Sequence, residues 1–142
     1  MTTIAYRAGV LAADTQMIQG TSVIGQTVKI VRRKDGVLCG GAGDLAWVQG
    51  FQRWFLEGEE GDPPPLDDAS KGLIIRPKKP IEMFEEFGAI EWTSPFVAIG
   101  SGKEFALGAM YVGATAEQAV RAAMVLDPFT GGKVMKLRHA KA

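Results

Sequence analysis

The segment TTIAYRAGVLAAD, residues 2–14, is the most informative stretch of this chain. Two short apolar runs, 2–6 and 10–14, are separated by residues 7–9, and a three-residue connection that ends in glycine is typical of a β-hairpin. Chain termini are ordinarily polar and loosely held, whereas this one enters an apolar run almost directly after the initiator methionine. We therefore expect the N-terminus to be built into the folded body.

The pairing register of this hairpin brings two polar residues together. We expect Tyr6 to face Val10 across the turn. The same register then places Thr2 opposite Asp14. A slip of one or two residues would still leave these two side chains near the open end of the hairpin.

A second hairpin follows in the sequence. The runs 27–34 (TVKIVRRK) and 37–42 (VLCGGA) flank an Asp-Gly pair, which is among the strongest short hairpin signals. If the last residue of the first run faces the first residue of the second, Lys29 faces Ala42. This lysine would then lie beside a glycine-rich connection that leads into a helix.

The rest of the chain alternates between helical and strand-like patterns. A polar, proline-rich loop is expected at residues 59–72, and Thr115 with Gln118 forms a capping-box signal. Helices are expected over 43–58, 101–113 and 115–127, and further strands over 72–76, 81–86, 89–93, 96–99 and 133–138. This order predicts an α+β fold in which helices pack on antiparallel sheets.

Composition narrows the classes of protein that fit the chain. The 142 residues suit one globular domain over 1–142, with 46% hydrophobic and 23% charged residues. Sixteen basic residues balance sixteen acidic ones, so no nucleic-acid partner is indicated. Neither a signal peptide nor a membrane-spanning run is expected, and the single cysteine fits a reducing compartment. We therefore expect a cytoplasmic protein without a membrane partner.

The residues brought together by the two hairpins have a chemical meaning. A threonine hydroxyl is a poor nucleophile, but removal of Met1 would give Thr2 an α-amino group with a pKa near neutral, about 8. That amine can accept the hydroxyl proton, which is the base role that a nucleophilic threonine requires. Lys29 would lower the pKa of the amine, and Asp14 would hold this lysine charged and oriented. Backbone N–H groups around Gly43 could stabilise an oxyanion.

These residues carry a resemblance to a known family. The stretches TTIAYRAGVLAADTQ, TVKIVRR, GGAGD and AIGSGKEFALGAMYVGATAEQAV resemble the proteasome β-type and HslV-like peptidases. The family consists of N-terminal-nucleophile hydrolases. The resemblance implies a four-layer αββα sandwich in which two antiparallel sheets lie between layers of helices.

The resemblance also implies roles for individual residues. Thr2 matches the family's nucleophile, Asp14 the acidic residue after the first hairpin, and Lys29 the lysine beside the nucleophile. Gly43 matches the donor of an oxyanion-binding N–H group, and Ser101 matches the serine that helps the terminal amine to transfer protons. The implied activity is that of a threonine-type endopeptidase that needs no metal and no organic cofactor. Its substrate would be a peptide or an unfolded protein.

One departure from the family leaves other functions open. Family members carry two full helices before the second set of strands, whereas here EEGDPPPLDD (59–68) follows the first helix. A homo-oligomeric ring and an ATP-dependent unfoldase partner are family properties that depend in part on those helices. The alternatives are an N-terminal-nucleophile amidohydrolase that acts on a small amide, and a non-catalytic member that forms or assembles a ring.

Several residues have simpler interpretations when each is taken alone. Ser101 would serve equally well as a helix N-cap. Residues 127–132 (DPFTGG) offer oxygen atoms to a cation, but they read more simply as a helix stop. Cys39 is interpreted as a small core residue, and no role is assigned to His139.

Overall fold

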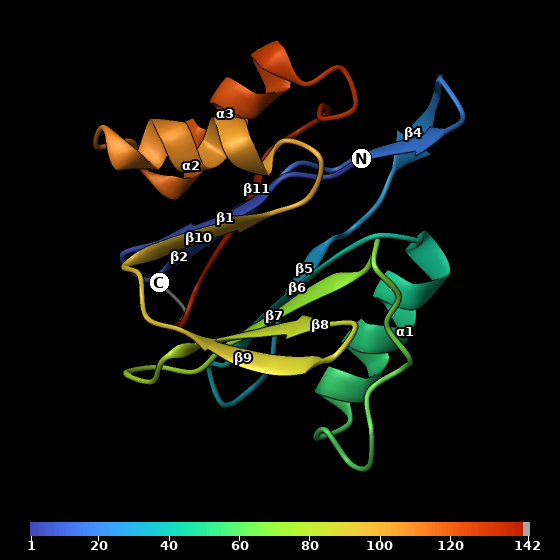
Figure 1. The fold of residues 1–142 in the computed structure, drawn as a ribbon, viewed down its shortest axis with the longest axis vertical. Coiled ribbons are helices and arrows are strands. Elements are labelled where there is room, and N and C mark those ends of the chain that lie inside the picture. The colour runs from blue at the N-terminus through green and yellow to red at the C-terminus, as the bar shows by residue number, and fades with distance from the viewer. Residues whose placement is uncertain (141–142) are drawn as a thin grey trace.

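The computed structural model describes residues 1–140, so the predicted domain, 1–142, extends two residues beyond the described range. The fold is α+β, as predicted, and Figure 1 shows two antiparallel sheets with helices on their outer faces. The first sheet has the strand order β10-β1-β2-β11 and the second β5-β6-β7-β8-β9, while β3 and β4 form a separate two-stranded sheet.

The strands and helices follow in the order of the chain. The strands are β1 (Ile4–Arg7), β2 (Val10–Ala13), β3 (Gln16–Gln19), β4 (Ser22–Gln26), β5 (Ile30–Arg32), β6 (Leu38–Ala42), β7 (Lys71–Ile75), β8 (Ile81–Glu85), β9 (Gly88–Trp92), β10 (Phe96–Ile99) and β11 (Met135–Arg138). The helices are α1 (Leu45–Leu56), α2 (Lys103–Tyr111) and α3 (Ala116–Leu126). No helix within residues 1–140 is long and apolar enough to span a membrane.

The alternation of side chains along β1 and β2 explains why the two large sheets pack face to face. Ile4 and Leu11 point to one face and join a buried cluster that includes Leu38 and Leu73 of the second sheet. Because successive side chains of a strand point to opposite faces, Ala5 lies on the other face of the first sheet. The main apolar core therefore lies between the two sheets.

The opposite face of the first sheet is covered by α2 and α3. The strands present Ala5, Ala12 and Ala98 there, and α3 presents Ala119 and Val120. These small side chains let the helices approach the sheet closely. Helix α3 begins with the predicted capping box, in which Thr115 and Gln118 exchange hydrogen bonds with each other's backbone.

Helix α1 covers the outer face of the second sheet through aromatic side chains. Its Phe51 ring lies over Gly72 of β7, where a Cβ atom would approach the ring to 2.5 Å. Phe51 also stacks on Trp47, with ring centroids 4.9 Å apart. Glycine at position 72 therefore makes room for the aromatic contact that fixes α1 to the sheet.

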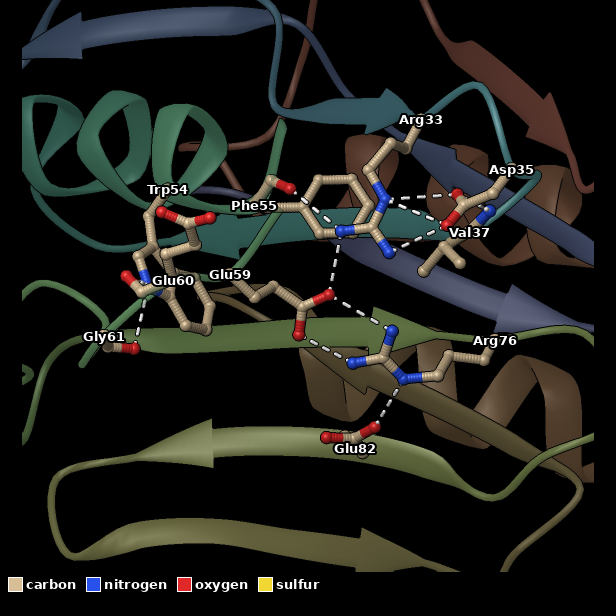
Figure 2. Close-up of polar contacts among 10 residues, drawn as sticks. All are labelled: Arg33, Asp35, Val37, Trp54, Phe55, Glu59, Glu60, Gly61, Arg76 and Glu82. Carbon is tan, nitrogen blue, oxygen red and sulfur yellow. Dashed lines mark hydrogen bonds and ion pairs between the residues drawn. The ribbon is translucent and has the colours of Figure 1, made fainter. Parts of the chain in front are cut away.

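A ladder of ion pairs ties the segment after α1 to the second sheet (Figure 2). Glu59 accepts hydrogen bonds from Arg33 at 2.8 Å and from Arg76 at 2.6 Å, and Arg76 also reaches Glu82 at 3.0 Å. The Arg33 guanidinium group stacks over the Phe55 ring at 4.5 Å from its centroid. Residues 57–70 contain no helix. The second helix that members of the resembled family carry is therefore absent here, as the sequence predicts.

The register predicted for the first hairpin is wrong by one residue. Tyr6 pairs with Leu11, and not with Val10, because the connection is a two-residue turn. Ala8 and Gly9 both adopt positive φ values, 52° and 80°, which is the conformation of a two-residue hairpin turn. Asp14 consequently lies opposite Thr3, whose carbonyl oxygen accepts from the Asp14 N–H at 3.2 Å.

The register of the second hairpin also differs from the prediction. Arg33 N–H donates to the carbonyl oxygen of Val37, so three residues form the connection, and Gly36 takes the positive φ of 87°. Lys29 therefore faces Gly41, whose N–H donates to the Lys29 carbonyl oxygen at 3.2 Å, and not Ala42. The predictions also missed the β3–β4 hairpin, whose residues are mostly exposed.

Candidate active site

The first hairpin places Thr2 in a buried position between the first sheet and the N-terminal end of α2. The residue is 6% exposed. Its N–H donates to Ser101 Oγ at 3.1 Å, and its carbonyl oxygen accepts from Gly102 N–H at 3.3 Å. Because Met1 is present, this nitrogen is an amide, and it marks the position that a free amine would take after cleavage of the Met1–Thr2 bond.

A buried ion pair lies next to this position. Lys29 Nζ is 3.0 Å from Asp14 Oδ1 and 3.2 Å from the carbonyl oxygen of Met1. Asp14 is fully buried and also accepts from the N–H groups of Thr3 at 3.0 Å and Gly131 at 3.1 Å. A buried carboxylate with three donors is a fixed acceptor, so it holds the lysine ammonium at the peptide bond between Met1 and Thr2.

A second chain of hydrogen bonds joins Thr2, through the predicted residue Ser101, to a buried aspartate that was not predicted as a site residue. Ser101 Oγ donates to Asp127 Oδ2 at 2.7 Å, and Thr130 Oγ1 donates to the same oxygen at 2.7 Å. Thr3 Oγ1 lies 2.7 Å from Thr130 Oγ1 and completes the chain. In the sequence Asp127 was interpreted as part of a helix stop, with a cation site as the less simple alternative, and neither interpretation pointed to Thr2.

The position of Ser101 removes one simpler interpretation. The N-cap of α2 is Gly102, and no side chain makes a capping hydrogen bond at this helix. Ser101 instead connects Thr2 with Asp127. Asp127 does end α3, as predicted for a helix stop, and its Oδ1 accepts from Phe129 N–H at 3.1 Å.

Burial and neighbouring charges shift the pKa values of three groups at the site. Burial, together with the charge of Lys29, lowers the pKa of the Met1 α-amino group below its ordinary value. Burial also lowers the pKa of Lys29, and the charge of Asp14 offsets part of this decrease. For Asp127 burial raises the pKa, but hydrogen bonds from Ser101 and Thr130 outweigh this effect, so the pKa lies below its ordinary value.

Gly43 lies at the junction of β6 and α1, where it adopts a positive φ of 132°. The next residue, Asp44, caps the helix by accepting from Ala46 N–H at 2.9 Å. A Cβ atom at position 43 would come within 3.1 Å of the backbone of Ser70, so a larger residue would be crowded there as well as strained. No hydrogen bond joins Gly43 to Thr2 within residues 1–140, which leaves its predicted role as an oxyanion donor open to experiment.

Gly100 fixes the position of Thr2, and its substitution should disturb the site. Its φ is +102°, and a Cβ atom there would collide with the Thr2 carbonyl oxygen. We expect Gly100→Ala to lower the free energy of unfolding by about 2–4 kcal/mol, because backbone strain and overpacking add. Urea denaturation measures this loss.

Gly58 supplies a matched control for that substitution. It has the same φ of +102°, but open space surrounds the position of its Cβ atom. Gly58→Ala should therefore lower the free energy of unfolding by the backbone strain alone, about 1 kcal/mol. If both variants lost the same free energy of unfolding, the collision with the Thr2 carbonyl oxygen would contribute nothing to the effect of Gly100→Ala.

The lowered pKa of Asp127 predicts a dependence of stability on pH. A carboxyl group whose pKa is lower in the folded state stabilises that state above its unfolded pKa of 3.8, and this contribution is lost as the pH falls through the folded pKa. We expect Asp127→Asn to flatten the decline in the free energy of unfolding below pH 4, measured by urea titration from pH 6 to pH 2. Asp68→Asn, at an exposed site, is the control and should keep the wild-type slope.

Comparisons with known proteins agree with this fold. No family model matches the chain, and no curated protein matches it by sequence. Among solved structures, HslV from Trypanosoma brucei aligns over 97% of this chain and 99% of its own, with 20% identity and a TM-score of 0.67. The chain has the proteasome-like fold of HslV.

Two other structures share this HslV-type fold. BPH from Thiobacillus denitrificans, in complex with Epoxomicin, aligns over 99% of both chains with 21% identity and a TM-score of 0.70. The Anbu (Gly-1) mutant from Hyphomicrobium sp. strain MC1 aligns over 96% of this chain and 80% of its own, with 18% identity and a TM-score of 0.73. The resemblance stated from the sequence is thus confirmed at the level of the fold.

Proposed function

We propose that this chain is an N-terminal threonine peptidase with Thr2 as its nucleophile. The observation that carries the proposal is the environment of the Met1–Thr2 bond. Its nitrogen contacts Ser101 Oγ at 3.1 Å, and its carbonyl oxygen contacts Lys29 Nζ at 3.2 Å, with Asp14 directly behind the lysine. A basic group and a proton-transfer chain therefore converge on one buried threonine near the start of the chain.

The proposed mechanism begins after cleavage of the Met1–Thr2 bond. The free Thr2 amine accepts the proton of its own hydroxyl group, and Oγ1 attacks the carbonyl carbon of the scissile peptide bond. The charge of Lys29 lowers the pKa of the amine and stabilises the developing alkoxide, while Asp14 keeps the lysine in place. Ser101 and Asp127 hold the amine and pass its proton to the leaving nitrogen.

The oxyanion of the tetrahedral intermediate would be bound by the backbone N–H of Gly43. Collapse of the intermediate breaks the peptide bond, releases the amine product and leaves an ester on Thr2. Water, activated by the same amine, then hydrolyses the ester. None of these steps requires a metal ion or an organic cofactor.

The HslV-type fold supports the remaining parts of the proposal. The packing of α1 and of α2 with α3 on opposite sides of the paired sheets is consistent with a four-layer αββα sandwich. We propose that copies of the chain form a ring in the cytoplasm, and that the ring cleaves peptides or unfolded proteins. Docking of an ATP-dependent unfoldase is part of the proposal, although residues 57–70 contain no helix where the resembled family carries one.

Intact mass and covalent labelling test the proposal. We expect purified protein to lack the mass of Met1, and we expect a peptide vinyl sulfone to add once, on Thr2, as located by peptide sequencing. Protein that retains Met1 serves as the control, because its Thr2 nitrogen is an amide and cannot act as the base. Absence of an adduct on the Met1-free protein would contradict the proposal and favour a non-catalytic ring component, for which the missing helix is the supporting observation.

The choice of substrate separates a peptidase from an amidohydrolase. Unfolded casein and a small primary amide can be offered to the Met1-free protein in parallel. We expect cleavage of casein. Hydrolysis of the small amide alone would assign the same catalytic residues to the amidohydrolase alternative.

A further inference from the structure

An aromatic cleft lies at the edge of the molecule, away from Thr2. Its volume is about 370 Å³, and it is lined by Tyr6, Trp92, Pro80 and Pro95. The lining comes from the end of β1, the turn before β8 and the connection from β9 to β10, which meet at the left edge of Figure 1. Grooves lined by aromatic rings and prolines are the surfaces on which extended proline-rich segments dock.

The same chain carries a segment of matching chemistry. Residues 62–66 read DPPPL and belong to the irregular connection between α1 and β7. Pro63 and Pro64 are partly buried against the body of the protein, where Trp47 Nε1 donates to the Pro64 carbonyl oxygen at 3.3 Å, whereas Pro65 is exposed. A run of prolines loses little entropy on binding because its backbone is already restricted.

The cleft and the segment lie on opposite sides of the molecule. The connection from α1 to β7 runs along the right side of Figure 1, and the turn between β7 and β8 lies at the left. The segment therefore does not reach the cleft of its own chain. A second copy can present it, and such a head-to-tail contact repeats from copy to copy until a ring closes or a filament grows.

The charges at the cleft and the charges that flank the proline segment are opposite in sign, which favours this segment as the ligand of the cleft. Lys79 lines the cleft and Lys78 precedes it in the sequence. Both are exposed, and neither forms an ion pair within residues 1–140. Asp62 and Asp68, which flank the prolines, are likewise exposed and form no ion pair in that range. Opposite charges at the edges of both surfaces would fix the register of the contact.

We propose that the cleft binds the proline segment, residues 62–68, of a second copy of this chain. The inference rests on the proposed assembly of copies and names one contact between them. No catalytic step enters it, so it does not depend on Thr2. The contact uses the segment that replaces the missing helix. It therefore gives the chain an assembly surface of its own.

Charge reversal in both surfaces tests the contact. Sedimentation velocity of the full chain should show oligomers in low salt. We expect Lys78→Glu with Lys79→Glu, and separately Asp62→Lys with Asp68→Lys, to raise the dissociation constant about tenfold or more. An equimolar mixture of the two variants should assemble again, because each reversed cleft then faces a reversed segment.

The control reverses two exposed lysines elsewhere, Lys34→Glu with Lys133→Glu, and should leave assembly unchanged. Far-UV circular dichroism and thermal melting check that every variant is folded. A synthetic peptide of residues 60–69 should compete with assembly of the wild-type chain. Oligomers that neither reversal weakens, or a mixture that fails to restore assembly, would overturn this inference and leave the proposed ring standing. A monomeric wild-type chain would contradict both.

Discussion

Thr2→Ala should remove peptidase activity while leaving the fold intact. Loss of a nucleophile that forms a covalent intermediate should lower kcat by at least about 10³-fold. The hydroxyl group of Thr2 makes no hydrogen bond within residues 1–140, so stability should change little. Steady-state cleavage of a fluorogenic peptide by Met1-free protein measures the loss, and urea denaturation confirms that the variant is folded.

Thr2→Ser is the matched variant for this experiment. Serine keeps both the hydroxyl group and the terminal amine, so we expect it to retain measurable activity and to accept the covalent label. Thr2→Ala should accept no label. Full activity of Thr2→Ala would exclude the mechanism, whereas loss of activity in both variants with an unchanged fold would show that the methyl group of threonine is also needed.

Lys29→Met should have the second large effect, on stability as well as on activity. Asp14 is fully buried and loses its cationic partner in this variant, although the N–H groups of Thr3 and Gly131 remain. Breaking a buried ion pair by removing one partner costs about 3–5 kcal/mol, because an uncompensated charge stays buried. We expect the free energy of unfolding to fall by this amount, measured by urea denaturation at pH 7.

A double substitution separates the charge from the packing. Asp14→Asn removes the carboxylate that Lys29→Met leaves unpaired, so the double variant should be more stable than Lys29→Met alone. Its activity should stay low, because the positive charge next to Thr2 is missing. If Lys29→Met were as stable and as active as the wild type, the ion pair would be dispensable and the proposed site would be wrong.

Much of the fold could be predicted because its signals are local. Short apolar runs between turn signals predict β1, β2, β6 and β7, and the Thr115–Gln118 capping box marks the start of α3. The β3–β4 hairpin was missed because its residues bury little surface, and a strand without a buried face leaves a weak pattern in the sequence. Strand boundaries also shifted by one to three residues, as at β5.

Some of the predicted site residues are brought together by contacts that are local in the sequence, and others are not. Thr2, Asp14 and Lys29 come together through two short hairpins, so approximate registers were enough to place them near one another. The registers themselves were wrong by one residue because the turn lengths depend on which residues take positive φ, Ala8 and Gly9 in one case and Gly36 in the other. Ala8 in particular gives no sign of this conformation, since only glycine adopts it without a steric cost.

By itself the sequence determined the two hairpins, the helices, the terminal threonine and the lysine beside it. The family resemblance alone pointed to Ser101 at the Thr2 amine, and the tertiary structure shows that it contacts Thr2, 99 positions away. Only the tertiary structure decided that Asp127 and Thr130 extend these hydrogen bonds to Thr3, 127 positions from Thr130. The physical reason is that α2 and α3 pack on the alanine face of the first sheet. This packing brings Ser101, just before α2, and Asp127, at the end of α3, next to the N-terminal residues. Such contacts depend on how surfaces pack, and no pattern of neighbouring residues records them.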